Sequence, residues 1–225
     1  EIPEGFAWIA GHQTAGRGQR GNTWQAEPHQ NLTLSILLRP SHALLEKQFF
    51  LSKAAANGIL DGLEAWSRAT QGENFNFEIK WPNDLYVRGR KIGGILIEQQ
   101  LNGTTLDWSI LGCGINVNET PDLVQATSIY QETGQRFKPL TVLTEYLDLL
   151  NGQQNLLFGD FFKLKRLFEE GMEWRNQLLQ FEKKDGPSFE GIIRGVNEQG
   201  QLQVEVNGTM QSYGNQEIRF LLPRT

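Results

Sequence analysis

Residues 11–24 read GHQTAGRGQRGNTW, and the rest of the chain is best understood from this stretch. It holds four glycines and two arginines, and no acidic residue occurs between Glu4 and Glu27. Glycine lets the backbone approach a ligand closely, so N–H groups can line up on phosphate or carboxylate oxygens while the arginines neutralise the charge. The stretch therefore predicts an anion-binding loop. A solvated surface turn and an RGG-like nucleic-acid contact are the alternatives.

Positive charge is concentrated in this loop and in one later segment. The formal net charge of the chain is −5, whereas residues 5–26 hold two arginines and no acid, and residues 80–91 hold four cations and one acid. The acidic remainder argues against a basic nucleic-acid-binding face. Two cationic segments in an otherwise acidic chain favour a site for a small anion.

The length and composition fit one large soluble domain, or one domain with a small appendage. A single cysteine, Cys113, excludes an internal disulfide, and no clustered histidine and cysteine spacing predicts a structural zinc site. The sequence contains no apolar run of about 18 residues and no basic-then-apolar start. These features predict a cytoplasmic protein with no membrane partner.

Apolar patterning places the loop between two predicted strands. Phe6–Ala10 is predicted as a short buried strand that leads into the loop, and Leu32–Leu38 as the strand that follows it. From Ala43 to about Arg68, apolar residues recur at helical spacing, with only the small Ser52 interrupting them. This segment is predicted to be a long core helix.

Further strands are predicted between residues 75 and 117, at Phe75–Ile79, Leu85–Val87, Ile92–Leu101 and Thr105–Val117. Asn102-Gly103 is a type I′ hairpin signal between the last two of them. Lys91 and Gly112 are therefore predicted to lie on neighbouring strands.

The C-terminal half changes from helical to strand patterning. Helices are predicted at Leu123–Tyr130, Leu140–Leu150 and Phe161–Trp174. Short strands are then predicted at Phe189–Val196, Leu202–Val206, Met210–Tyr213 and Ile218–Leu222. The shift predicts a small β-barrel at the end of the chain.

Three motifs follow the loop: KWPND at 80–84, RKIGGILIE at 90–98 and GCGINVN at 112–118. With GRGQRGNTW ahead of them, in this order and at these spacings, they resemble the catalytic domain of biotin protein ligases, from about residue 6 to the end. The resemblance implies an α+β fold, with a mixed β-sheet flanked by helices similar to that of class II synthetases, over residues 1–180. It also implies a small SH3-like β-barrel over residues 181–225, and no N-terminal DNA-binding domain.

The activity that the resemblance implies is ATP-dependent activation of biotin to biotinyl-5′-AMP, followed by transfer to a lysine of the biotin carboxyl carrier protein of acetyl-CoA carboxylase. A carboxylic acid is inert toward an amine at neutral pH, so adenylation must supply a leaving group. Fixed cations and N–H donors then offset the repulsion between the biotin carboxylate and the α-phosphate. The expected ligands and partners are biotin, ATP with Mg²⁺, and the carrier protein, with no nucleic acid; the sequence leaves a monomer or a homodimer open.

Residue roles follow from the same resemblance. The expected catalytic residues are Lys91 and Arg17. The expected biotin contacts are Gln13, Gly16, Arg17, Gly18, Gln19, Lys91, Gly112 and Gly114. The expected ATP contacts are Arg20, Trp24, Asn83, Asp84, Lys91 and Asn116, with magnesium near Asp84.

The chain departs from the family pattern at three points. Gln19 stands where the commonest form of the loop, GRGRRG, has arginine, and Asn22 stands where many bacterial members have arginine. The family's Ser-Thr-Asn biotin contact, expected upstream of Glu1, is absent from the sequence. The two substitutions predict a change in how firmly the adenylate is retained.

Other functions remain alternatives to the ligase interpretation. A lipoate or octanoate ligase or transferase shares the architecture, and a non-catalytic biotin sensor would keep Gln13 and the glycines. For single residues, Trp24 and Trp81 are also explained as core aromatics and Lys80 as a structural ion-pair partner. Cys113, between two glycines on a predicted strand, is expected to be inert packing.

Overall fold

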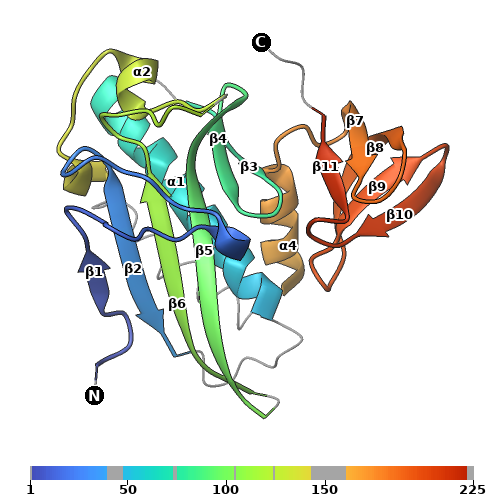
Figure 1. The fold of residues 1–225 in the computed structure, drawn as a ribbon, viewed down its shortest axis with the longest axis horizontal. Helices are drawn as coiled ribbons and strands as arrows, with labels where there is room; N and C mark the ends of the chain where they lie inside the picture. The colour runs from blue at the N-terminus through green and yellow to red at the C-terminus, as the bar shows by residue number, and fades with distance from the viewer. Residues whose placement is uncertain are drawn as a thin grey trace.

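Two β-sheets and three α-helices make up the part of the chain that the structure describes, residues 2–39, 48–72, 75–103, 105–123, 125–142 and 161–221 (Figure 1). The structure is a computed structural model. The first sheet has the strand order β1-β2-β6-β5-β4-β3, and the second has the order β10-β9-β8-β7-β11. Named strands pair antiparallel, and single parallel bridges join Ile79 to Met172 and Lys91 to Ala126. The α+β class is as the sequence predicts.

The first sheet carries the motifs. Its strands are β1 (Ala7–Ile9), β2 (Leu32–Leu38), β3 (Phe77–Lys80), β4 (Asp84–Val87), β5 (Arg90–Asn102) and β6 (Thr105–Ile115). The strands β2, β6 and β5 form its centre, and every residue of β2 except Ser35 is buried. Across β5 and β6, Gly94 pairs with Gly114 and Leu96 with Gly112. The prediction that Lys91 and Gly112 lie on neighbouring strands is confirmed.

At one edge of this sheet, β1 differs from the buried strand that the sequence predicts. Its partner strand is β2, and the opposite side carries no further strand among the described residues. Trp8 and Ile9 keep 40% and 50% of their surface exposed. An apolar run of this length does not distinguish an edge strand from a central one, because only the neighbours decide burial.

Helices cover one face of the first sheet. Figure 1 shows α1 (Gln48–Gln71) behind the strands, with α4 (Phe161–Glu170) packed against it. Ile59, Leu63 and Trp66 of α1 are buried at helical spacing, as predicted. The start of the predicted helix, residues 43–47, lies outside the described residues, and so do residues 143–150 of the helix predicted at Leu140–Leu150. No helix in the described part of the chain is long and apolar enough to cross a membrane.

The helix predicted over Leu123–Tyr130 is replaced by a short helix, α2 (Ile129–Thr133). The residues before it pair with the edge of β5: the Lys91 N–H donates to the Gln125 carbonyl at 2.7 Å, and the Thr127 N–H donates to the Lys91 carbonyl at 2.8 Å. The Gln125 carbonyl and the Thr127 N–H therefore form hydrogen bonds with a strand and not within a helix.

The same effect shortens α4, which ends at Glu170 and does not continue to Trp174 as predicted. The N–H of Ile79 on β3 donates to the Gly171 carbonyl at 2.7 Å, and the Glu173 N–H donates to the Ile79 carbonyl at 2.9 Å. In both places a strand edge captures backbone groups that local periodicity assigns to a helix.

The second sheet is an open sheet and not the closed barrel that the sequence predicts. Its strands are β7 (Leu178–Lys183), β8 (Ser188–Val196), β9 (Leu202–Val206), β10 (Thr209–Tyr213) and β11 (Ile218–Phe220). The edge strands β10 and β11 lie at opposite ends of the hydrogen-bonding order. Stacked rings of Phe181, Phe189 and Tyr213 form its core. Because β7 crosses the predicted boundary at residues 180 and 181, we propose that the C-terminal domain begins before Leu178.

Buried hydrogen bonds join the two sheets. The indole N–H of Trp81, which is 4% exposed, donates to the carbonyl of Gly200 at 2.9 Å. The Val196 N–H donates to Oε1 of Glu169 on α4 at 3.0 Å. Breaking one such bond leaves a buried polar group unpaired, which costs about 1–3 kcal/mol. These bonds therefore hold the C-terminal sheet in a defined position on the first.

A buried lysine lies beside this junction. Lys53 of α1 is 0% exposed, and its Nζ lies 4.7 Å from the ring centroid of Phe49 and 5.5 Å from that of Phe168. Burial lowers the pKa of Lys53 to about 7; nearby Lys165 lowers this pKa further, and Glu169 opposes the shift. The folded protein therefore disfavours the charged form of Lys53.

We expect Lys53→Met to raise the free energy of unfolding by about 1–2 kcal/mol near neutral pH, because methionine fills the same space without a charge. Since the pKa is lower in the folded than in the unfolded state, the unfolded chain binds more protons between about pH 7 and pH 10, and the wild-type penalty fades over that range. Denaturant unfolding at about pH 6.5 and pH 9.5 checks this. The exposed lysine variant Lys138→Met is the control. The prediction is contradicted if Lys53→Met raises the free energy of unfolding by the same amount at both pH values.

Candidate active site

The glycine-rich loop crosses the face of the first sheet opposite α1 (Figure 1). Backbone bonds close the loop on itself: the Trp24 N–H donates to the Gly16 carbonyl at 2.9 Å, and the Gly18 N–H donates to the Asn22 carbonyl at 2.7 Å. Between them Gln19–Gly21 forms a 3₁₀ turn, in which Gly21 has a φ of 85°. Glycine adopts this left-handed conformation without the steric cost that other residues meet. The sequence therefore folds locally into a compact loop with both ends fixed.

Trp24 attaches the end of the loop to the centre of the sheet. A Cβ added to Gly114 on β6 would lie 2.5 Å from two atoms of the Trp24 ring, so the ring packs directly on the glycine backbone. The Trp24 Nε1 is buried, yet the described residues offer it no hydrogen-bond partner. A buried donor without a partner is uncommon in proteins, and it is a binding opportunity for a ligand or water acceptor.

A cavity of about 440 Å³ lies between the loop and the sheet. Its volume is in the range of small-molecule sites. Of the residues predicted as ligand contacts, it brings together Gln13, Arg17, Gly18, Gln19, Trp24, Asn83, Asp84, Lys91, Gly112 and Gly114. Residues from the loop, from the KWPND motif and from the central strands therefore converge on one space.

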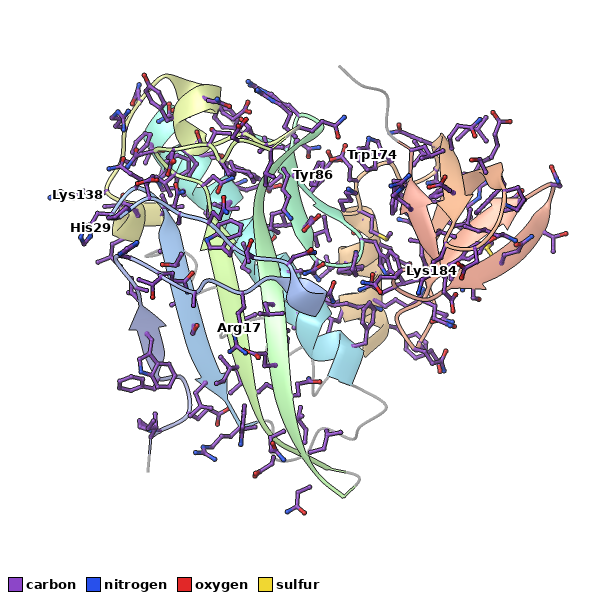
Figure 2. All side chains as sticks on the ribbon, in the orientation of Figure 1. Arg17, His29, Tyr86, Lys138, Trp174 and Lys184 are labelled. Atoms are coloured by element: carbon purple, nitrogen blue, oxygen red, sulfur yellow. The ribbon has the colours of Figure 1, made fainter. Side chains whose placement is uncertain are left out.

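Among the described residues, both cations that line the cavity are paired with carboxylates. Lys91 Nζ lies 2.6 Å from Asp84 Oδ1, and the two side chains are 34% and 26% exposed. Arg17, which lies in front of the first sheet in Figure 2, has its Nη2 3.0 Å from Glu98 Oε2, with exposures of 71% and 39%. An exposed ion pair such as Arg17–Glu98 contributes about 0–1 kcal/mol. An anionic ligand can therefore replace Glu98 at small cost.

Two predicted contacts lie elsewhere, and a third is described only in its backbone. Asn116 is 2% exposed and does not line the cavity; its Nδ2 donates to the Thr127 carbonyl at 3.0 Å, which braces the segment paired with Lys91. Gly16 is buried beneath the Trp24 carbonyl and lines a neighbouring cavity. The backbone of Arg20 lies in the 3₁₀ turn, and its side chain lies outside the described residues.

Several lining residues were not predicted from the sequence. Thr33 and Ser35 on β2 line the cavity, and so does Glu98 on β5. Thr33 and Ser35 alternate with the buried Leu32, Leu34 and Ile36, so period-two patterning of polar residues on an apolar strand was the available signal. Glu98 closes the RKIGGILIE motif, but its contact with Arg17 depends on tertiary structure.

Two other predicted alternatives concern side chains near the cavity. The Lys80 Nζ donates to the Tyr86 hydroxyl at 3.1 Å, and burial lowers the pKa of Lys80. Cys113 is buried, and burial raises the pKa of its thiol to about 12. A thiol with a raised pKa is a poor nucleophile, which agrees with the packing role predicted for Cys113.

Comparison with known proteins places the chain in a class of enzymes. Residues 1–116 match the model of the biotin/lipoate A/B protein ligase family. The chain is 31% identical to the bifunctional ligase/repressor BirA of Escherichia coli, over 97% of this chain and 67% of that protein. It is 29% identical to the biotin–[acetyl-CoA-carboxylase] ligase of Mycobacterium tuberculosis, over 91% of this chain and 75% of that protein.

The solved structures agree with the sequence comparison. The biotin protein ligase of Aquifex aeolicus in complex with biotin and ATP superposes with a TM-score of 0.79 at 26% identity, covering 100% of this chain and 91% of the other. The fold and the matches define a carbon–nitrogen bond-forming enzyme of the ligase class. The chain belongs to the biotin/lipoate A/B protein ligase family.

The packing of Trp24 predicts a loss of stability on substitution of Gly114 but little change on substitution of its neighbour across the sheet, Gly94. We expect Gly114→Ala to lower the free energy of unfolding by about 1–3 kcal/mol, because its methyl group overlaps the Trp24 ring. Gly94→Ala is the control, since the atom nearest to its added Cβ is 3.7 Å away, an ordinary contact. We expect it to change stability by less than about 0.5 kcal/mol. Denaturant unfolding measures both, and equal losses would contradict the packing argument.

Proposed function

We propose that this protein activates biotin with ATP to biotinyl-5′-AMP and transfers the biotinyl group to a lysine of a biotin carboxyl carrier protein of acetyl-CoA carboxylase. The observation that carries the proposal is the convergence of the glycine-rich loop and Lys91 on one cavity of about 440 Å³. The similarity of this chain to a biotin protein ligase in complex with biotin and ATP supports the choice of ligands. Relatives named as acetyl-CoA-carboxylase ligases support the choice of carrier.

The reaction needs two steps, the first at the α-phosphorus of ATP and the second at the carboxyl carbon of biotin. A biotin carboxylate oxygen attacks the α-phosphorus of ATP, the bond to the β-phosphate oxygen breaks, and pyrophosphate leaves. The neutral amine of the carrier lysine then attacks the carboxyl carbon and the amide forms. The bond from that carbon to the anhydride oxygen breaks, AMP leaves with its electron pair, and the amine proton goes to solvent. Negative charge develops on the α-phosphoryl oxygens in the first step, and on the carboxyl oxygen and the departing phosphate of AMP in the second. These atoms are neighbours in the anhydride, so preorganised cations beside them accelerate both steps.

Lys91 and Arg17 are the cations in the proposed mechanism. Lys91 is held in place by its strand, by the backbone of Gln125 and Thr127, and by Asp84. We assign it to the biotin carboxylate and then to the phosphoryl oxygens, where a fixed charge costs no reorganisation during reaction. Arg17 has an exposed side chain on a glycine-flanked loop, so we assign it to closing the loop over the adenylate.

Neutral residues of the cavity complete the proposed site. We assign Gln13 to the ureido ring of biotin and Trp24 to the adenine, where the unpartnered Nε1 offers one donor. Gly112 leaves space for the ligand on the sheet, whereas Gly114 leaves space for the Trp24 ring. We assign Asn116 to an indirect role, because it braces the segment that holds Lys91.

A magnesium ion bound with ATP fits this donor set in a limited way. The described residues form no cluster of three or more side chains able to hold a metal ion. Mg²⁺ in nucleotide sites is commonly held by one or two carboxylates and the substrate phosphates. Asp84, with one oxygen on Lys91, is the residue that would share the ion, and the ion would neutralise phosphate charge.

Transfer of labelled biotin to a carrier domain tests the function. We expect transfer only when ATP is present, and we expect Lys91→Ala to lower biotin-dependent ATP–pyrophosphate exchange by about 10²–10³-fold, because one preorganised cation is lost. Lys138→Ala, an exposed lysine outside the cavity, is the control. Exchange with lipoate or octanoate in place of biotin would overturn the choice of substrate. Normal exchange by a folded Lys91→Ala protein would overturn the role of Lys91.

Arg17 and Glu98 form one ion pair but are predicted to affect ligand binding in opposite directions. We expect Arg17→Ala to weaken retention of biotinyl-adenylate by about 10-fold or more, since a charge-assisted hydrogen bond is lost. Glu98→Gln should strengthen retention by about 2–5-fold, because Arg17 no longer has a competing carboxylate. The rate of adenylate release measures both. Thermal stability should change little in either variant, and weaker retention in both would mean that the ion pair itself is required.

A further inference from the structure

A second cavity, of about 600 Å³, lies between the glycine-rich loop and the C-terminal sheet. Four residues line both cavities: Gln19, Asn22, Pro82 and Asp84. The loop is thus a wall shared by the two spaces. On the opposite side the second cavity is lined by β7, β11 and the turn that holds Asn215, with Lys184 at the edge facing the first sheet (Figure 2).

One side-chain hydrogen bond crosses from the loop to that turn. Asn215 Nδ2 donates to Gln19 Oε1 at 2.9 Å, and the bond is partly buried. It joins residues that are 196 positions apart in the chain. Gln19 begins the 3₁₀ turn of the loop, so the bond acts at the point where the loop changes direction.

The turn that presents Asn215 is well fixed. The Gly214 N–H donates to Glu217 Oε2 at 2.7 Å, the Glu217 N–H donates to the Gly214 carbonyl at 3.1 Å, and the Lys184 N–H on the neighbouring segment donates to the Glu217 carbonyl at 2.9 Å. These bonds leave the backbone at residues 214–217 little freedom. Asn215 is therefore a defined donor and not a freely moving side chain.

The sheet that carries this turn is itself fixed to the body of the protein. Besides the buried bonds of Trp81 and Val196, the ring of Phe220 on β11 lies 5.9 Å from that of Trp174 and has the Lys80 Nζ 5.5 Å from its centroid. The position of Asn215 relative to the first sheet is thus set by packing. A hydrogen bond from a fixed donor fixes its acceptor as well.

The loop depends on such outside contacts. Residues 14–22 contain three glycines and no large apolar side chain, so burial does little to offset the entropy lost on ordering them. Among the described side chains of this stretch, Arg17 makes a further contact, the exposed ion pair with Glu98. The Asn215 bond is partly buried and does not involve a group that the ligand must displace.

We propose that Asn215 is a positioning residue for the glycine-rich loop. Its hydrogen bond to Gln19 docks the loop on the C-terminal sheet and keeps the wall between the two cavities closed. Its consequence for the intermediate rests on the proposed function: the C-terminal sheet slows the escape of biotinyl-adenylate without touching it. The positioning itself does not rest on that function, and it is measurable in the protein without ligand.

Hydrogen exchange in the full chain tests the proposal. We expect Asn215→Ala to raise amide exchange across residues 16–22 by about 2–10-fold, the factor that one neutral hydrogen bond contributes, with the unfolding midpoint unchanged. Adenylate release should accelerate by the same factor. In a Gln19→Ala background Asn215→Ala should have a smaller effect than in the wild type, because the bond between these two residues is already absent. Asn215→Asp should stay within about twofold of wild type, since the Gln19 amide can rotate and donate.

Gln180→Ala is the matched control, because it removes a side-chain hydrogen bond, 2.7 Å to Glu190, within the same sheet but away from the loop. It should change neither exchange nor release. The proposal is overturned if amide exchange across residues 16–22 is unchanged in Asn215→Ala. It is also overturned if Asn215→Ala raises this exchange as much in the Gln19→Ala background as in the wild type. A different outcome separates the two proposals. If Asn215→Ala raises amide exchange but neither the wild type nor any variant forms an adenylate from biotin, the proposed function fails and the positioning role stands.

Discussion

The contact between the Trp24 ring and the backbone of Gly114 is the constraint on which the site depends. A Cβ at Gly114 would lie 2.5 Å from the ring, so only glycine lets the end of the loop lie flat on β6. The Trp24 N–H then holds the Gly16 carbonyl, which closes the loop behind the ring. With the base of the loop attached in this way, its tip spans a cavity of about 440 Å³ and does not collapse onto the sheet. The glycines are thus required for packing as well as for ligand approach.

The electrostatic state of the free site follows from this geometry. A cavity with unpaired cations on a partly desolvated sheet would cost free energy, and Asp84 and Glu98 remove that cost by pairing with Lys91 and Arg17. The pairs differ in kind. Lys91 is also held through its backbone, so it stays in place when its carboxylate partner is exchanged. Arg17 has no such support among its described contacts beyond the bridge to Thr23, so its position follows its partner.

Local patterns in the sequence predicted the strands, the long helix and the neighbouring positions of β5 and β6, because these depend on periodicity and on the Asn102-Gly103 turn. They missed β7, which lies between β8 and β11. They also missed the strand-like segments at 125–127 and 171–173, because strand edges capture their backbone groups through tertiary contacts. The same limit applies to the site. Motifs placed the cations and glycines, but the carboxylates that pair with them, and the burial of Asn116, depend on the register of the sheet.

The strengths of the loop contacts suit an intermediate that must be held and then released. An exposed ion pair contributes about 0–1 kcal/mol and one neutral hydrogen bond about 0.5–1.5 kcal/mol, so together Glu98 and Asn215 favour the docked loop by about 0.5–2.5 kcal/mol. That leaves an undocked fraction of about 1–30% in the free protein, which is high enough for ligand entry without unfolding. In the proposed mechanism, ligand contacts made by Arg17 and the backbone N–H groups would add to the Asn215 bond and replace only the Glu98 pair. Closure over the intermediate would then be tighter than closure over an empty site, although the same loop and the same C-terminal anchor would be used in both states.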